Sequence, residues 1–255
     1  TGNMLVDDPK ALEFLFAHVP TILLTHCESS PIVTANEALY RAQYGENVPA
    51  HLHPLIRDEA CCYASSKMAV ELAKKYQTQL HVLHLTTAKE LSLFENKPLH
   101  EKHITAEVCI HHLHFDAQDY DQLGHLIKCN PTKKTKTDRD ALIKAVSSSD
   151  LLDIIGTDHA PHTWDEKQNS YFNAPAGLPL VQHALPALLE LVAADQLRIE
   201  DMVSKTSHRV ADLFKIKERG YIREGSWADL VLVEKNPWSV AEQPIYMHCG
   251  WTPFQ

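Results

Sequence analysis

The sequence predicts an α/β protein built on a parallel sheet, and three observations lead to this fold class. Stretches with helical and with strand periodicity alternate along most of the 255 residues. The hydrophobic share of 44% suits a packed core, and no apolar run is long enough to cross a bilayer. Polar side chains follow several predicted strands directly, which is where parallel α/β folds collect functional groups.

Composition excludes several classes of function. The formal net charge of −9 disfavours nonspecific nucleic-acid binding, so no nucleic-acid partner is expected. Residues 1–4 have neither the basic nor the apolar region of a signal peptide. The six cysteines form no CxxC pair and read as reduced thiols. We therefore expect a cytoplasmic protein that does not associate with membranes. The expected partner is a small-molecule substrate, and the expected assembly is a homodimer.

The first quarter of the chain predicts two helices around one strand. Residues 7–19 carry aspartates and a proline at the start and apolar residues at helical spacing. A strand follows over 21–25, and the period of two puts His26 on the same face as its apolar residues. Residues 29–56 contain three prolines and are expected to form a loop with one short helix. Residues 58–76 are strongly amphipathic and predict a helix.

Two further strands are predicted in the middle of the chain. The first covers 80–85 and places His84 at its C-terminal end, as His26 is placed in the preceding strand. His81 points to the opposite face and is interpreted as structural. The second strand covers 104–110 and ends in His111-His112. The remaining predictions here are short helical segments at 89–94 and 120–126, a turn at 129–131 and a helix at 138–146.

The stretch 152–162 organises the rest of the sequence. Residues 151–155 form a short apolar run that predicts a buried strand, and Asp158, His159 and His162 follow it. A carboxylate and two imidazoles are costly to bury without partners, and a divalent metal ion is a natural partner for both. The alternative is that Asp158 caps a helix at a strand–helix junction.

Beyond this stretch the pattern changes. A polar loop is predicted at 163–173, a tight turn at 174–179, and helices at 181–193 and 201–214. Residues 220–233 read as two strands around a turn, which would belong to a small β unit beside the α/β body.

The polar residues that end successive strands predict a metal-dependent site. They are His26, His84, His111/His112 and Asp158. Imidazole and carboxylate ligands suit Zn²⁺, and Mn²⁺, Fe²⁺ and Co²⁺ use the same ligand types. Such a metal lowers the pKa of bound water toward ~7, and a carboxylate beside it can carry the proton. Asp158 is the candidate for that role. His162 could contact a substrate's anionic group or carbonyl, or it could cap the next helix.

Several motifs carry a resemblance to a known family. The string 156–162 (Gly-Thr-Asp-His-Ala-Pro-His) resembles the strand-eight motif of dihydroorotases, in the cyclic amidohydrolase branch of the amidohydrolase superfamily. Residues 25–28, 80–88 and 105–113 resemble other strand ends of that family, 174–179 resembles its substrate loop, and 225–231 resembles its small β domain.

The resemblance implies a (β/α)₈ TIM-type barrel with a binuclear zinc site. It implies reversible hydrolysis of the cyclic amide of dihydroorotate to carbamoyl aspartate, in pyrimidine biosynthesis. By motif position it implies the following roles: metal ligands His26, His84 and Asp158, with Asp158 also the general acid/base, and substrate contacts from Asn130, His162, Ala176 and Gly177.

The sequence also departs from that family. In the family, the first barrel strand carries a His-x-His pair with an arginine nearby, and the fourth strand carries a carboxylated lysine or an aspartate that bridges the metals. No such segment precedes Asp7. We therefore expect residues 1–215 to hold only the later four βα units and 216–255 to be part of a small β-sandwich domain. These residues alone are expected to be inactive. Lys133-Lys134 stand where the family often has Pro-Leu-Arg.

Two alternatives to dihydroorotase activity remain open from the sequence. The same chemistry could act on a hydantoin, dihydropyrimidine or allantoin ring. The chain could also be a non-catalytic homologue that serves as a structural partner. Asn130 and the 156–162 string favour dihydroorotate over the other rings.

Overall fold

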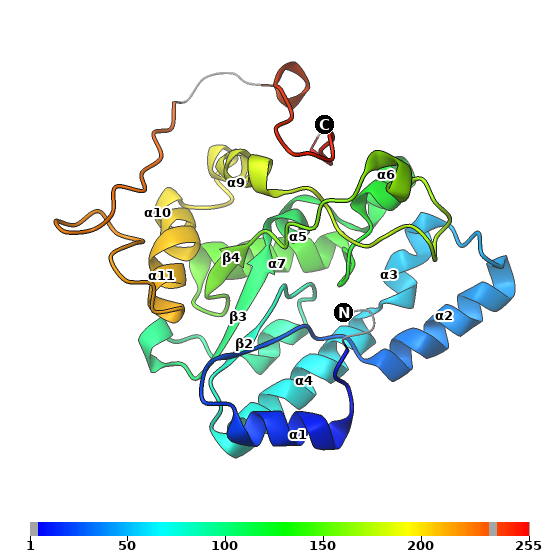
Figure 1. Cartoon of the computed structure of the whole chain (residues 1–255), viewed down its shortest axis with the longest axis horizontal. Helices are drawn as coiled ribbons and strands as arrows, with labels where there is room; N and C mark the ends of the chain where they lie inside the picture. The colour runs from blue at the N-terminus through cyan, green and yellow to red at the C-terminus, as the bar shows by residue number, and fades with distance from the viewer. Residues whose placement is uncertain (1–4, 235–238, 255) are drawn as a thin grey trace.

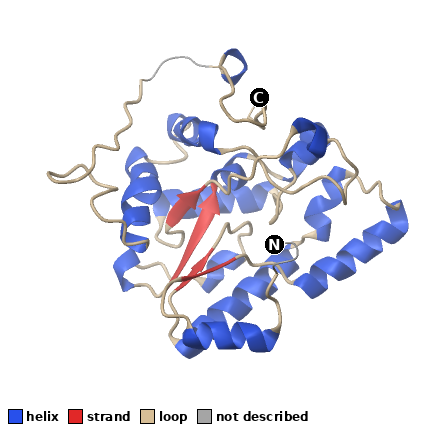
Figure 2. Cartoon of the chain, in the orientation of Figure 1, coloured by secondary structure: helices blue, strands red, loops and turns tan. Residues whose placement is uncertain are grey.

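The computed structural model describes residues 5–234 and 239–254, and its centre is a four-stranded parallel sheet. The strands are β1 (Leu23–Thr25), β2 (Leu80–Val82), β3 (Ile104–Cys109) and β4 (Ile154–Gly156). They lie in the order β1-β2-β3-β4, and every neighbouring pair is parallel. Helices surround the strands on the outside of the sheet (Figures 1 and 2). The predicted α/β fold with a parallel sheet is confirmed.

Helices connect consecutive strands. The α-helices are α1 (Pro9–His18), α2 (Ser30–Tyr44), α3 (His53–Ile56), α4 (Glu59–Tyr76), α5 (Ile110–His114), α6 (Tyr120–Leu123), α7 (Lys136–Ser148), α8 (Trp164–Lys167), α9 (Ala184–Ala193), α10 (Ile199–Val203) and α11 (Arg209–Leu213). Short 3₁₀ turns lie between several of them. No helix in the described residues is long and apolar enough to span a membrane.

Local capping explains why several predicted helices begin where they do. The side chain of Asp8 accepts from the Ala11 N–H at the start of α1, and Asp58 accepts from the Cys61 N–H at the start of α4. Thr135 and Asp138 form a reciprocal capping box at the start of α7. These three helices confirm the predictions at 7–19, 58–76 and 138–146, because caps are encoded within four residues.

The prediction for residues 29–56 was wrong. This segment contains the fifteen-residue helix α2 as well as α3, rather than a loop with one short helix. Pro31 lies in the first turn of α2, where a proline lacks no needed hydrogen bond and its fixed φ favours the helix. Pro31 therefore marks the start of a helix and not a loop.

The prediction of two strands at 220–233 was also wrong. In the described part of residues 216–255 the structure contains turns and one short 3₁₀ segment, and no strand. Ile222, Leu230 and Leu232 are exposed. A lone hairpin is marginal in water without a further strand or helix to cover its apolar face. The ranges 1–215 and 216–255 remain a domain prediction, and residues 1–4, 235–238 and 255 lie outside the described residues.

Other elements were predicted in place but differ in extent. The strand expected at 80–85 ends at Val82, and the strand expected at 151–155 runs over Ile154–Gly156. The helix expected at 201–214 begins at Ile199 and passes through a π-helical turn, Ser204–His208, between α10 and α11. The helix expected at 181–193 begins with a 3₁₀ turn at Val181–His183. The loop expected at 163–173 contains α8.

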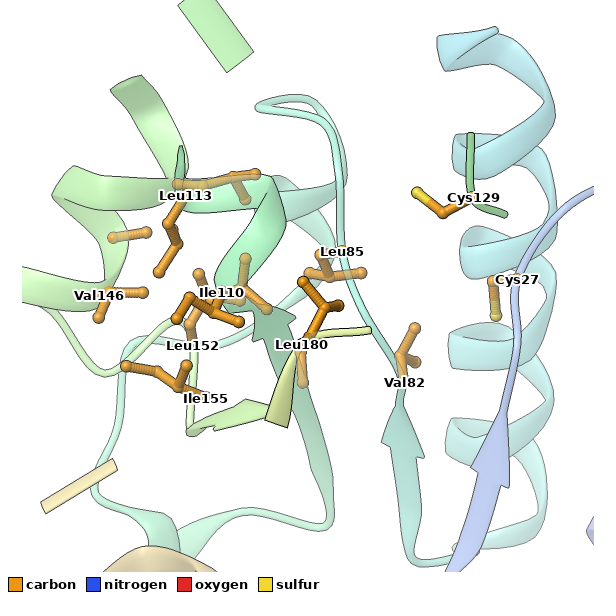
Figure 3. Close-up of a cluster of buried hydrophobic side chains, with 14 of the residues drawn as sticks. Cys27, Val82, Leu85, Ile110, Leu113, Cys129, Val146, Leu152, Ile155 and Leu180 are labelled. Atoms are coloured by element: carbon orange, nitrogen blue, oxygen red, sulfur yellow. The ribbon is translucent and has the colours of Figure 1, made fainter. Parts of the chain in front are cut away.

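The main hydrophobic core lies between the sheet and the helices that cover it. Figure 3 shows side chains from β2, from the start of α5, from α7 and from the segment after Gly177 meeting in one cluster. Val82, Ile110 and Leu152 are almost fully buried. Burial of this kind contributes roughly 25 cal/mol per Å² of apolar surface. The core fixes the strands and thereby the positions of the residues that follow them.

Candidate active site

Two predicted metal ligands converge at the C-terminal ends of β1 and β2. His26 directly follows β1, and His84 lies two residues beyond β2. Parallel pairing of these strands brings the two side chains together, with His26 Nδ1 3.2 Å from His84 Nε2. The rings meet edge to face, with centroids 4.9 Å apart. Residues 58 positions apart in sequence therefore share one point at the rim of the sheet.

A buried carboxylate orients the His26 ring. His26 Nε2 donates to Glu28 Oε2 at 3.0 Å, and Arg57 Nη1 donates to the same oxygen at 2.6 Å. Burial alone would raise the pKa of Glu28, but the His26 hydrogen bond and the Arg57 charge lower it to about 2. Glu28 is thus an anion at neutral pH. Because Glu28 accepts the Nε2 proton, the Nδ1 atom of His26 carries a lone pair, and it faces His84.

Asp158 lies at the same rim. It follows β4, is exposed, and is close enough for its charge to raise the pKa of His84, although burial and the neighbouring His26 lower that pKa overall. His84 and Asp158 both have positive φ, 39° and 48°. Non-glycine residues adopt this conformation at a cost, and such strain gathers at functional sites.

The donor set fits a divalent metal ion. Two ligand nitrogens bound tetrahedrally at 2.0–2.1 Å to zinc lie about 3.3 Å apart, close to the spacing seen here. Burial keeps His84 neutral, which is the form that binds metals. The ring nitrogen of His84 that faces away, Nδ1, is buried with no hydrogen-bond partner among the described residues. The Glu28–His26 bond is of the kind that orients metal-binding histidines.

The segment after Asp158 is joined to the predicted substrate loop. Ala160 N–H donates to Leu178 O at 3.0 Å, and a parallel bridge pairs His159 with Leu178. His159 Nδ1 accepts from the Leu180 and Val181 N–H groups at 2.9 and 3.1 Å. His159 is therefore structural: it holds the two segments side by side and leaves Asp158 at the rim.

Neither Asp158 nor His162 caps the next helix. That helix, α8, begins at Trp164, and Thr163 caps it in a reciprocal box with Glu166. Both capping alternatives from the sequence are therefore excluded.

Three of the four predicted substrate-binding residues are brought together. Gly177 has a φ of 147°, and a Cβ added to it would lie 2.6 Å from Ala160 O and 3.0 Å from His162 Nε2. Only glycine lets the loop approach this closely. Ala176 is the preceding residue, so it lies on the same stretch of chain as Gly177. His162 thus adjoins the loop that carries Ala176 and Gly177.

The segment that contains Asn130 is hydrogen-bonded to this loop. Lys128 O accepts the Gly177 N–H at 2.9 Å, two residues before Asn130. Asn130 Oδ1 is buried and has no hydrogen-bond partner in the described residues. A buried acceptor without a partner is uncommon and leaves a group free for a ligand.

The other histidines at strand ends take different roles. His81 is fully buried and contacts Thr105 Oγ1 at 2.8 Å, as expected for a structural residue. His111 and His112 lie in α5 and are also buried, with pKa values lowered by burial. Both are therefore part of the buried interior.

Sequence reasoning missed four residues that shape the site. Glu28 and Arg57 orient His26, and Lys128 and Lys167 hold the predicted substrate loop. Glu28 could have been found, because a carboxylate two residues after a strand-end histidine lies within reach of its ring. The lysines gave no local signal, because their acceptors are main-chain carbonyls distant in sequence.

The parallel α/β sheet thus carries two imidazoles and a carboxylate at its C-terminal rim, a donor set that suits a divalent metal ion. The Amidohydrolase family model matches residues 57–251, and the chain belongs to this family. The Methanosphaera stadtmanae protein named dihydroorotase is 30% identical over 250 residues, which cover 96% of this chain and 57% of that protein. The Pyrococcus horikoshii dihydroorotase is 34% identical over 192 residues, covering 74% and 43%. The chain spans about half the length of the curated relatives it matches.

Solved structures agree on the fold. An L-hydantoinase (dihydropyrimidinase) from Arthrobacter aurescens superposes with a TM-score of 0.82 at 20% identity, over 89% of this chain and 52% of that one. A Saccharomyces cerevisiae dihydroorotase in complex with 5-fluoroorotic acid gives 0.57 at 21% identity, over 62% and 44%. At these identities the likeness concerns the fold alone.

Proposed function

We propose that the protein to which this chain belongs is a dihydroorotase, which reversibly hydrolyses the cyclic amide of dihydroorotate to carbamoyl aspartate in pyrimidine biosynthesis. The observation that carries the proposal is that two groups of residues lie together at the C-terminal edge of the sheet. His26, His84 and Asp158 form the metal side, and the Gly177 loop against His162 forms the substrate side. Relatives named dihydroorotase, 29–34% identical, support the choice of ring.

We also propose that the sheet is the later half of a (β/α)₈ barrel. The strand order β1-β2-β3-β4 has no reversal, as in consecutive barrel strands, whereas doubly wound sheets reverse direction once. Leu24 on β1 is 46% exposed, which fits a face that further strands would cover. The domain ranges 1–215 and 216–255, and inactivity of these 255 residues alone, belong to this proposal.

In the proposal His26, His84 and Asp158 hold zinc, in a site that is binuclear in the complete enzyme. Held there, zinc would supply Lewis acidity toward the ring amide carbonyl and would lower the pKa of water so that hydroxide is available at neutral pH. Glu28 keeps the His26 ring in the tautomer that a metal needs.

Asp158 is proposed to move the proton. Its carboxylate takes a proton from the attacking water and delivers it to the departing ring nitrogen, and the reverse steps close the ring. The exposed rim position of Asp158 leaves its carboxylate accessible to a substrate.

Asn130, His162, Ala176 and Gly177 are proposed to bind the substrate. The role of Asn130 is supported by its buried Oδ1, which has no hydrogen-bond partner among the described residues. His162 Nε2 lies beside Gly177, so a ring held by the loop would also meet the imidazole.

The test is an assay of the full natural protein with dihydroorotate, hydantoin, dihydrouracil and allantoin, before and after metal removal by a chelator. We expect hydrolysis of dihydroorotate above all and its recovery with added zinc. A preference for another ring would identify a different cyclic amidohydrolase, and no hydrolysis of any ring would support a non-catalytic homologue. Size-exclusion chromatography and cell fractionation would test the proposed cytoplasmic homodimer.

A further inference from the structure

Several buried lysines of the described residues have main-chain carbonyls in place of carboxylates as partners, and two of them, Lys128 and Lys167, bind the loop at 174–177. Lys128 is 7% exposed and Lys167 is 1% exposed. By contrast, the buried Lys102 pairs with Asp153 at 2.8 Å. In the described part of the chain no carboxylate lies within ion-pair distance of Lys128 or Lys167. Burying an ammonium group without a counter-ion is costly, so what it binds instead is informative.

Lys167 brackets the two residues proposed to contact the substrate ring. It is the last residue of α8, and its Nζ donates to Pro175 O and Gly177 O, both at 2.9 Å. These carbonyls flank Ala176. A third bond, at 3.1 Å, goes to Lys128 O. Three acceptors match the three hydrogens of an ammonium group, so its donors are taken up by two loop carbonyls and by Lys128 O.

Lys128 holds the same loop from the other side. Its Nζ donates to Ala174 O at 2.7 Å and also to Tyr171 O. Its own carbonyl accepts both the Gly177 N–H and the Lys167 ammonium. The chain beside Asn130 and the loop at 174–177 are therefore joined through the two lysines.

Burial opposes this arrangement, which argues against a passive role. Burial, with the neighbouring positive charges of Lys133 and Lys128, lowers the pKa of Lys167 to about 7. An apolar side chain would avoid that desolvation but would leave the inward-facing carbonyls without donors. The Lys167 ammonium group supplies the hydrogen-bond donors that the carbonyls of Pro175 and Gly177 need in this buried position.

We propose that Lys167 is a positioning residue, which holds the main chain of Ala176 and Gly177 against the substrate ring and thereby sets the affinity for the substrate. The inference rests on the proposed function for the identity of that ring. Lys167 does not touch the reacting atoms in this account and acts only through the loop. Its loss should therefore affect substrate binding far more than the chemical step.

Lys205 provides a matched control. It is also buried to 1% exposure without a carboxylate partner at its ammonium group, and its Nζ donates to Ser149 O at 2.8 Å. Burial lowers its pKa to about 8. Ser149 precedes β4, so Lys205 lies at the opposite end of the sheet from Asp158. Replacing either lysine by methionine removes a similar buried ammonium, but only Lys167 serves the loop.

The experiment compares Lys167→Met, Lys167→Gln and Lys205→Met in the full natural protein loaded with metal. For Lys167→Met we expect KM for dihydroorotate to rise about 10-fold or more, the effect of losing hydrogen bonds from a charged donor, while kcat changes less than about threefold. Lys167→Gln, which keeps part of the donor set, should be intermediate and guards against a variant that fails to fold. Lys205→Met should leave KM unchanged.

Hydrogen exchange of the amides at 174–178 gives a second readout that requires no substrate. Lys167→Met should speed their exchange about 10-fold or more, and Lys205→Met should not. Equal effects of the two variants on KM or on this exchange would overturn the positioning role. If the wild-type protein hydrolysed no cyclic amide, the proposed function would fail, and exchange at 174–178 would still uphold or overturn the role of Lys167.

Discussion

The metal side and the substrate side of the candidate site are held by opposite electrostatic means. Around His26 the charges are paired, since the Glu28 carboxylate accepts from both His26 and Arg57. Around the substrate loop, Lys128 and Lys167 donate only to main-chain carbonyls. One side is a closed ion-pair network, and the other is a set of positive charges without counter-ions among the described residues.

This difference matches what each side would bind. A carboxylate behind an imidazole supports a bound cation, because it fixes the ring and increases its basicity. Where these lysines are protonated, the positive potential at the loop favours an anionic substrate such as a carboxylate. The two sides would thus attract partners of opposite sign to one rim. The following predictions test this contrast, from the largest expected effect on activity to the smallest.

Asp158→Asn should cause the largest loss. It removes the proton carrier and nearly preserves shape, so kcat for dihydroorotate should fall about 10²–10⁴-fold. Steady-state kinetics, with metal content measured on the same sample, checks this. His162→Ala in parallel should mainly raise KM. Near-normal turnover of Asp158→Asn with metal in place would assign the proton transfer to another residue.

Glu28→Gln tests the paired side. Removing the carboxylate that orients His26 should weaken zinc affinity about 10–100-fold, as measured by competition with a chelator. Glu37→Gln is the control, because Glu37 lies 3.9 Å from the Arg57 guanidinium and does not contact His26. Equal losses in both variants would mean that Arg57, and not the His26 bond, is what matters.

Gly177→Ala tests the close approach on the substrate side. The added Cβ would lie 2.6 Å from Ala160 O at a φ that side chains rarely adopt, so KM should rise and stability should fall by about 1–3 kcal/mol. Gly45→Ala has a positive φ too, but open space around its Cβ. It should lose less stability and keep its KM, which substrate titration and thermal unfolding would measure.

The last prediction concerns stability alone, through its pH dependence. The pKa of Lys167 is about 7 in the folded protein, below its usual 10.5, so between these values the unfolded chain binds more protons. Stability contributed by this group is therefore full above about 10.5 and lost as pH falls to about 7. In Lys167→Met the free energy of unfolding should rise with pH less steeply across this window, by up to about 1.4 kcal/mol per pH unit. Denaturant titrations of both proteins between pH 7 and 10 measure the slopes, and identical slopes would contradict the lowered pKa.

The sequence by itself determined the alternation of helices and strands and the rim positions of His26, His84 and Asp158. These depend on information within a few residues: a cap such as Asp58, an apolar strand, and the polar residue that follows it. Once the strands are parallel neighbours, their ends must meet at one edge. The convergence of His26 and His84 was therefore predictable from order alone.

Only the tertiary structure decided the rest. Pro31 could start a helix or break one, and residues 220–233 had strand periodicity but no partner sheet among the described residues. Lys167 reads as an ordinary surface lysine at the end of a short helix, yet its ammonium group is buried against carbonyls from 128, 175 and 177. Such contacts arise from packing between distant segments, because main-chain carbonyls are present at every residue and leave no trace in the sequence.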